Sequence, residues 1–142
     1  MSTKSETALS KKLGIQAGQA VLLLNVPDDA AEILFPSLPA GVEILWETAE
    51  KQVDLILFWP KTLHQLPEKF EALQTQIVPD GAIWSLIPKK KFASKRGITF
   101  SWEEMQAAGL ETDLVDNKVA TFSDEDYGTR FVIRKEFREK YR

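Results

Sequence analysis

The sequence predicts an α/β fold with a mostly parallel sheet that ends in an antiparallel C-terminal hairpin. Two observations predict this fold. Apolar runs without alternation at 20–26 and 53–59 are typical of strands buried on both faces, and helical patterns separate such runs. Nearer the C-terminus, segments 113–122 and 127–135 flank an acidic turn, a pattern that predicts a hairpin.

Length and composition predict one domain over residues 1–142, with an N-terminal helix at 1–14, a core at 20–134 and a charged tail at 135–142. The 142 residues include no cysteine and one histidine, which excludes disulfides, thiolate catalysis and multi-histidine metal centres. A site of carboxylates and water alone could still hold magnesium or calcium, but we expect no metal. The polar N-terminus carries no signal-peptide pattern, and no apolar run is long enough to cross a membrane, so we expect a soluble cytoplasmic protein without a membrane partner.

The first half of the chain begins with a capping box of Thr3 and Glu6 and a helix that Gly14 ends. After the strand at 20–26, Pro27 opens a short helix that Pro36 stops. Strand candidates at 41–45 and 53–59 follow, separated by a segment too short for a crossover helix. That segment reaches back roughly 20 Å, about one strand length. This favours a parallel return that places the first strand between the two; an antiparallel pair is the alternative.

The second half predicts an amphipathic helix from Leu63 to Ile77, in which Pro67 marks a break or restart. A turn at 79–81 and a strand at 82–88 follow. Ser101 and Glu104 form a second capping box, Phe100 and Met105 suit a hydrophobic staple, and Gly109 is expected to end that helix. The acidic residues 124–126 read as a solvated hairpin tip, and the tail as helical or frayed.

Two segments resemble the S-adenosylmethionine-dependent methyltransferases. "LGIQAGQAVLLLNVPDDAAEIL" is similar to the turn, first strand and following loop of that family, and "VDLILFW…LHQLPEKFEALQTQIVPDGAIWSLIPK" to its later strand–helix–strand block. With the C-terminal hairpin, the resemblance covers residues 13–134. It implies a three-layer Rossmann-like sandwich of truncated topology. The chain also resembles a group of small bacterial proteins of unknown function, which implies no activity.

The chain departs from the family where the cofactor would bind. Leu23 stands in place of the strand's acidic residue, and Asn25, Pro27 and Asp29 stand where glycines would let the backbone approach a ligand. The strand at 41–45 best matches the family's third strand, so the second strand and the position of its ribose-binding carboxylate are expected to be missing. The resemblance therefore implies that S-adenosylmethionine is possible, but we expect no cofactor.

Ligands of open α/β sheets bind beyond the carboxyl ends of the strands. The strand ends in the sequence supply seven candidate ligand-binding residues: Asn25, Glu47, Trp59, Lys61, Lys89, Lys90 and Lys91. No catalytic residue can be assigned from the sequence. The segment 89–96 holds five basic residues and no acid, in a chain whose net charge is −3. It predicts either a site for a small anionic molecule or a solvated basic loop. The mild net charge argues against nucleic acid.

Several candidates have two interpretations. Glu47, which lies 22 positions after Asn25, is either a ribose-binding acid or a surface carboxylate. Asn25 either binds a ligand or ties down its own loop. Trp46 and Trp59 are stacking partners or rim packing, and His64 is a general base or an exposed histidine.

These features lead us to expect a non-catalytic module that binds a small ligand or regulates, and is not an enzyme. The alternative is a methyltransferase or other group-transfer enzyme with an altered cofactor loop. A third hypothesis is a protein-interaction module, in which an exposed hairpin or charged tail contacts a partner or a second copy.

Overall fold

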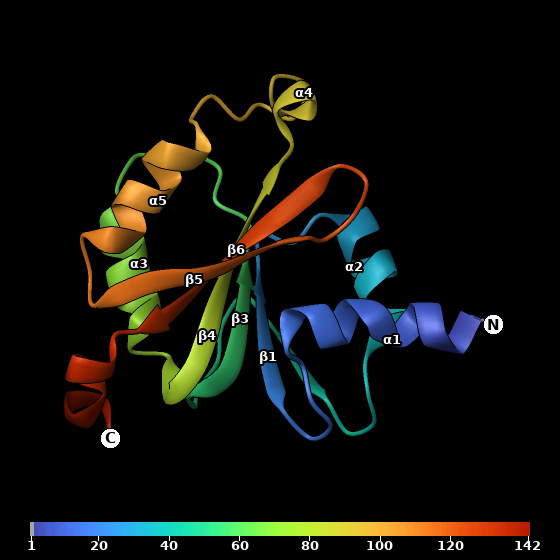
Figure 1. Cartoon of the computed structure of the whole chain (residues 1–142), viewed down its shortest axis with the longest axis horizontal. Coiled ribbons are helices and arrows are strands. Elements are labelled where there is room, and N and C mark those ends of the chain that lie inside the picture. The colour runs from blue at the N-terminus through green and yellow to red at the C-terminus, as the bar shows by residue number, and fades with distance from the viewer. Residues whose placement is uncertain (1) are drawn as a thin grey trace.

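The computed structural model describes the backbone of residues 2–142 and the side chains of residues 8–142. The strands form one central sheet, and helices lie on both of its faces (Figure 1). In chain order the elements are α1 (Ser2–Leu13), β1 (Ala20–Leu24), α2 (Asp28–Leu34), η1 (Phe35–Ser37), β2 (Glu43–Trp46), β3 (Val53–Phe58), α3 (Leu66–Gln74), β4 (Ile77–Pro88), α4 (Lys90–Ala93), α5 (Trp102–Leu110), β5 (Leu114–Thr121), β6 (Asp126–Ile133) and η2 (Lys135–Tyr141).

The sheet has six strands in the order β2-β1-β3-β4-β6-β5. Strands β1 to β4 are parallel, and β6 runs antiparallel to both β4 and β5. This confirms the predicted α/β class, the parallel return and the C-terminal hairpin. Strand β1 lies between β2 and β3, and the helices on the two faces of the sheet bury its five residues from both sides, as their uninterrupted apolar sequence predicted.

The sequence matched the strand at 41–45 to the family's third strand and so expected the second strand to be missing; the structure does not agree with this match. Val21 of β1 aligns with Ile44 of β2, and the two strands pair directly. Strand β2 therefore occupies the place beside β1, which in dinucleotide-binding sheets belongs to the second strand. The carboxyl end of that strand is the place of a ribose-binding acid, and here it carries Glu47.

Two helical layers cover the sheet (Figure 1). Helices α3 and α5 pack on one face, where Phe70, Met105 and Phe131 belong to one buried cluster. Helices α1 and α2 pack on the other face around Leu13, Leu34 and Trp84. The Trp84 indole N–H donates to the Leu13 carbonyl at 2.9 Å, which fixes the end of α1 on β4. In the described part of the chain no helix is long and apolar enough to cross a membrane.

Helix α3 differs from its predicted extent. It begins at Leu66, with Pro67 in its first turn, so the proline marks a start and not an internal break. Proline suits this position because the first N–H groups of a helix have no acceptor within the helix, so the N–H that proline lacks is not needed. Leu63 precedes the helix and is partly exposed, and Ile77 belongs to β4.

The predicted turn at 79–81 lies inside β4. The register with β3 shifts from Val53 opposite Ile77 to Leu55 opposite Ala82, so the strand bulges where the sequence indicated a reversal. Gly81 is required there because a Cβ would lie 2.6 Å from the Asp54 carbonyl oxygen. The glycine in this segment therefore marks a close approach of β4 to β3 and not a reversal of the chain.

Helix α5 confirms its capping box. The Ser101 hydroxyl accepts from the Glu104 N–H, and the Glu104 carboxylate accepts from the Ser101 N–H. Gly109 does not end the helix, which runs to Leu110; it lies against Phe131, where a Cβ would come within 2.4 Å of the ring. At α1, the left-handed Gly14 follows the last helical residue as predicted, whereas the Thr3–Glu6 capping box lies outside the described side chains.

The C-terminal tail forms the 3-10 helix η2 and is tied back to the loop before β5. The Tyr141 hydroxyl donates to Asp113 at 2.6 Å, and the Lys140 ammonium lies 2.8 Å from the same carboxylate. These two hydrogen bonds lower the pKa of Asp113. Burial and the bond to Asp113 raise the pKa of Tyr141 to about 12.

Candidate functional site

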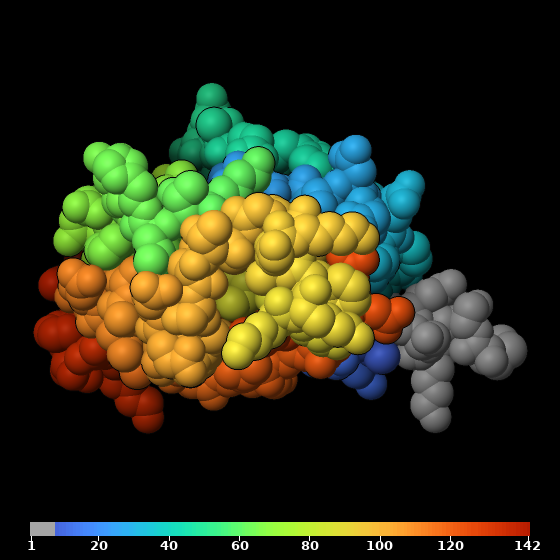
Figure 2. All heavy atoms as spheres, turned by 90° about the horizontal axis from the view of Figure 1, so that it is seen from above, coloured from blue at the N-terminus to red at the C-terminus, as the bar shows by residue number. Residues whose placement is uncertain are grey.

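The carboxyl ends of β1, β2, β3 and β4 meet at one edge of the sheet, and a cavity of about 710 Å³ opens there. The strand order reverses at β1, since β2 lies on one side of it and β3 on the other, and open α/β sheets bind ligands at such a point. Figure 2 looks onto this end, with residues 90–100 between α3 and α2. The lining residues are Asn25, Val26, Pro27, Glu47, Trp59, Pro60, Lys61, Thr62, Leu86, Pro88, Arg96, Gly97 and Ile98.

Asn25 turns the chain out of β1. Its φ of 59° lies in the left-handed region, which asparagine tolerates better than most residues. Its side-chain amide donates to the Trp59 carbonyl at 3.2 Å and joins the ends of β1 and β3. Asn25 therefore ties down its own loop, one of its two predicted roles, while remaining exposed on the cavity wall.

Glu47 turns the chain out of β2 in the same way, with a φ of 62°. Its Oε2 atom accepts a hydrogen bond from the Asn25 backbone N–H at 2.9 Å. The spacing of 22 residues noted in the sequence thus corresponds to a direct contact across the β1–β2 edge. The carboxylate is exposed at the cavity, and Oε1 has no hydrogen-bond partner among the described residues.

Trp59 forms part of the cavity wall but does not offer a free stacking face. Its side chain is 3% exposed and meets Phe122 edge to face, with ring centroids 5.5 Å apart. Its indole N–H donates to Asp126 Oδ2 at 3.1 Å. Trp46, the other candidate, is 51% exposed, packs edge-on against Phe35 and does not line the cavity.

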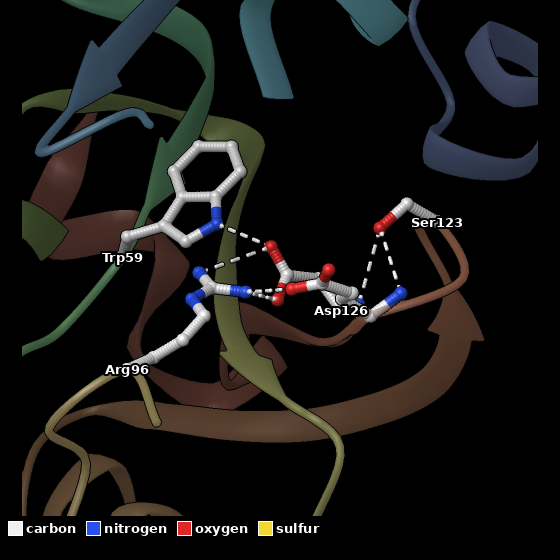
Figure 3. A network of polar contacts seen from close by, with 5 residues as sticks. Trp59, Arg96, Ser123 and Asp126 are labelled. Atoms are coloured by element: carbon white, nitrogen blue, oxygen red, sulfur yellow. Dashed lines mark hydrogen bonds and ion pairs between the residues drawn. The ribbon is translucent and has the colours of Figure 1, made fainter. Parts of the chain in front are cut away.

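Asp126 is the centre of a polar network that the sequence did not reveal (Figure 3). It accepts from Trp59 and from Arg96, whose second nitrogen lies 3.4 Å from Oδ2. The Ser123 hydroxyl accepts from the backbone N–H of Asp126 at 3.1 Å. Asp126 is only 3% exposed, so the interpretation of residues 124–126 as a solvated tip is wrong for this residue. Its charge is paired because an isolated buried carboxylate would be costly.

The basic segment 89–96 does not bring its lysines to the cavity. Lys61 is exposed on the wall, but Lys89, Lys90 and Lys91 are not among the lining residues, because α4 continues away from the end of β4. Arg96 alone of this segment lines the cavity, held there by Asp126 and, at 3.6 Å, by Glu125. The positive charge predicted at this edge is therefore partly neutralised.

A second cavity of about 410 Å³ adjoins the first. The two share Asn25, Pro60, Lys61 and Thr62, so the segment after β3 separates them. His64 is exposed on the wall of this second cavity, together with Glu68 and Lys69 at the start of α3. Within residues 8–142, no group of three or more acidic or histidine side chains is placed to hold a metal ion.

The chain has the Rossmann-like fold of the methyltransferases. It superposes on the N-methyltransferase NodS from Bradyrhizobium japonicum WM9 with a TM-score of 0.60 and 13% identity, covering 94% of this chain and 95% of that one. For an S-adenosylmethionine-dependent methyltransferase from Clostridium acetobutylicum ATCC 824 the TM-score is 0.62 at 8% identity, covering 92% of each chain. No family model and no curated protein matches the sequence.

These findings correct the expectation of a non-catalytic module. The solved structures that share this fold include several methyltransferases, among them a TehB-like enzyme from Corynebacterium glutamicum ATCC 13032 with a TM-score of 0.57 at 10% identity, covering 91% of this chain and 87% of that one. The expectation also relied on the loss of the family's second strand, and β2 occupies that strand's place beside β1. The expectation that no cofactor binds loses the same support.

Proposed function

We propose that the chain is an S-adenosylmethionine-dependent methyltransferase that acts on a small molecule and has an altered cofactor loop. The observation that carries the proposal is the contact between Glu47 and Asn25 at the mouth of the 710 Å³ cavity. It sets an acidic side chain at the end of the strand beside β1, where the acid that binds ribose hydroxyls lies in related sheets. The likeness of the fold to solved methyltransferases supports the same assignment.

The cavity fits the nucleoside end of this cofactor. Its volume lies within the range of about 300–1,000 Å³ typical of small-ligand sites. Glu47 would accept from the ribose hydroxyls through Oε1, since Oε2 is already bonded to the loop. The apolar side chains of Val26, Leu86 and Ile98 would contact the base.

The methionine end would be held by side chains instead of glycine-loop amides. The N–H of Asn25 already donates to Glu47, and Pro27 has no N–H to offer. Asp28 and Asp29, which begin α2 just after the lining residue Pro27, would attract the ammonium and sulfonium charges. Lys61 and Arg96 on the opposite wall would attract the carboxylate.

The second cavity would take the methyl acceptor. When bound, S-adenosylmethionine supplies an electrophilic methyl group. His64 is placed to accept the proton that an amine or hydroxyl acceptor loses, because it is exposed on the wall of a cavity that adjoins the first. Lys61 belongs to both walls and would position an anionic acceptor between them.

Isothermal titration calorimetry with S-adenosylhomocysteine tests the proposal without the need for an acceptor. We expect saturable binding by the wild type and a loss of about tenfold or more in affinity for Glu47→Gln, since a charged hydrogen bond is worth about 1.5–3 kcal/mol. Glu50→Gln is the matched control, because Glu50 is exposed and does not line the cavity.

A thermal-shift measurement adds a second readout. Ligand at about 100 times its dissociation constant stabilises the folded state by about 2.7 kcal/mol. Absence of binding by the wild type at millimolar S-adenosylhomocysteine would sink the proposal. Equal affinity in the two glutamine variants would show that Glu47 does not hold the ligand.

A further inference from the structure

A third hollow, of about 270 Å³, lies between the end of α1 and the β5–β6 hairpin. It shares no residue with the two cavities at the carboxyl edge of the sheet. We call it the basic groove, and it is lined by Lys11, Lys12, Leu13, Gly14, Asn117, Lys118 and Arg130. Four of these residues are cationic and none is acidic.

A bulge in the hairpin creates the groove's central charge pair. The register of β5 and β6 shifts between Asp116 and Lys118, which leaves Asn117 as the extra residue. The shift sets Lys118 directly opposite Arg130, and residues opposite each other in an antiparallel pair point to the same face. Like charges in this arrangement destabilise a sheet, and bulges commonly re-aim side chains at functional sites.

Nothing in the described structure neutralises this charge. Among the side chains of residues 8–142, none of the four cations forms an ion pair with a carboxylate. Lys118 donates to the Lys12 carbonyl at 2.9 Å at the end of α1, and within residues 8–142 this carbonyl is the only hydrogen-bond acceptor of the four side chains. Burial and the nearby charge of Arg138 lower the pKa of Arg130, as expected of a partly buried cation that lacks a counter-ion.

We propose that the basic groove binds the phosphate group of a small phosphorylated molecule. A doubly charged phosphate would relieve the repulsion between Lys118 and Arg130 and accept hydrogen bonds from both. A neighbouring hollow meets the groove at Asn117 and is lined by the cations Arg134, Lys135 and Arg138 and by one acid, Glu136, so a second anionic group has cations within reach.

The dimensions favour a small ligand over a nucleic acid strand. The groove holds only about 270 Å³, and it has no aromatic lining residue on which a base could stack. The chain as a whole carries a net charge of −3, which opposes binding of a long polyanion. Because the groove is separate from the carboxyl-edge cavity, this proposal does not depend on the proposed methyltransferase function.

Calorimetric titration with inorganic pyrophosphate at fixed ionic strength tests the proposal. We expect saturable binding by the wild type and a loss of about tenfold or more in affinity for Arg130→Gln, because a charge-assisted pair is removed. The matched control is Lys90→Gln, which removes the same charge from an exposed helix outside the groove. An equal loss in both variants, or no binding at about 10 mM pyrophosphate, would overturn the site, since general attraction to a cationic surface is weak and screened by salt.

Thermal unfolding keeps the test informative if Arg130→Gln alters the fold. Without ligand, the variant should melt at the same temperature as the wild type or higher, because a like-charge pair has been removed. Pyrophosphate should raise the melting temperature of the wild type only. A variant that melts lower and still gains from pyrophosphate would overturn the proposal. A short single-stranded oligonucleotide that binds more tightly than pyrophosphate, with the same loss in Arg130→Gln, would overturn the assignment to a small molecule.

Discussion

The guanidinium of Arg96 and the carboxylate of Asp126 form a partly buried ion pair across 30 residues of sequence. The pair joins the segment after α4 to the first residue of β6 and holds Arg96 on the wall of the carboxyl-edge cavity. The Trp59 indole N–H donates to the same carboxylate. Asp126 therefore holds in place two residues of the cavity wall, Trp59 after β3 and the cationic Arg96.

Asp126→Ala should destabilise the fold by about 3 kcal/mol, because it leaves Arg96 and the Trp59 indole without their shared acceptor. Urea unfolding measures the change. Asp124→Ala is the control, since Asp124 is exposed two residues earlier in the same turn. Similar losses in the two variants would show that the buried network adds nothing beyond turn chemistry.

The left-handed conformation of Asn25 makes a second, separate prediction. Asn25→Ala loses the bond to the Trp59 carbonyl and meets a backbone conformation that alanine adopts poorly, so we expect a loss of about 2 kcal/mol. Asn25→Gly loses the same bond but adopts this conformation without strain, and should be about 1 kcal/mol more stable than the alanine variant. Urea unfolding measures the stability of both variants. A more stable alanine variant would contradict the role assigned to the left-handed conformation.

Gly109 supports a third prediction, because the structure places it against Phe131 and not at the end of the helix as the sequence predicted. Gly109→Ala should cost about 1–3 kcal/mol although alanine favours helices, since the new Cβ would lie 2.4 Å from the Phe131 ring. Ala107→Gly, on the exposed side of the same helix, should cost about 1 kcal/mol through propensity alone. A gain in stability for Gly109→Ala would mean that the ring moves aside freely.

The contact of the tail with Asp113 predicts a pH dependence. The pKa of Asp113 is lowered by its bonds to Lys140 and Tyr141, so its stabilising effect is complete above its ordinary value of 3.8. That effect is lost as the pH falls below 3.8 through the lowered pKa of the folded state. The wild type should therefore melt at a higher temperature than Asp113→Asn at neutral pH, and the gap should narrow in acid.

The control for this prediction is Asp80→Asn, which changes an exposed carboxylate in the β4 bulge. It measures, at the same pH values, the effect of removing an exposed carboxylate outside the contact with the tail. A gap for Asp113→Asn that widens below pH 3.8 would contradict the assigned direction of the pKa shift.

Local patterns in the sequence were enough to predict the elements and most of their order. Apolar runs named the buried strands, the Ser101–Glu104 capping box placed the start of α5, and the short β2–β3 connection favoured the parallel return. It also indicated Asn25, Glu47, Trp59 and Lys61 as residues of one sheet edge, because strand ends can be read from local patterns.

Which charged side chains contact one another depends on the packing of distant elements and could not be predicted from the sequence. The sequence indicated Asp126 as a turn residue, whereas in the structure it begins β6 and contacts Trp59 and Arg96. The three lysines at 89–91 do not line the cavity, because α4 continues away from it. The bulge at Asn117 that sets Lys118 opposite Arg130 also leaves no signal in the sequence. Local periodicity records which face of its own element a residue lies on, whereas these pairings depend on the register between distant strands.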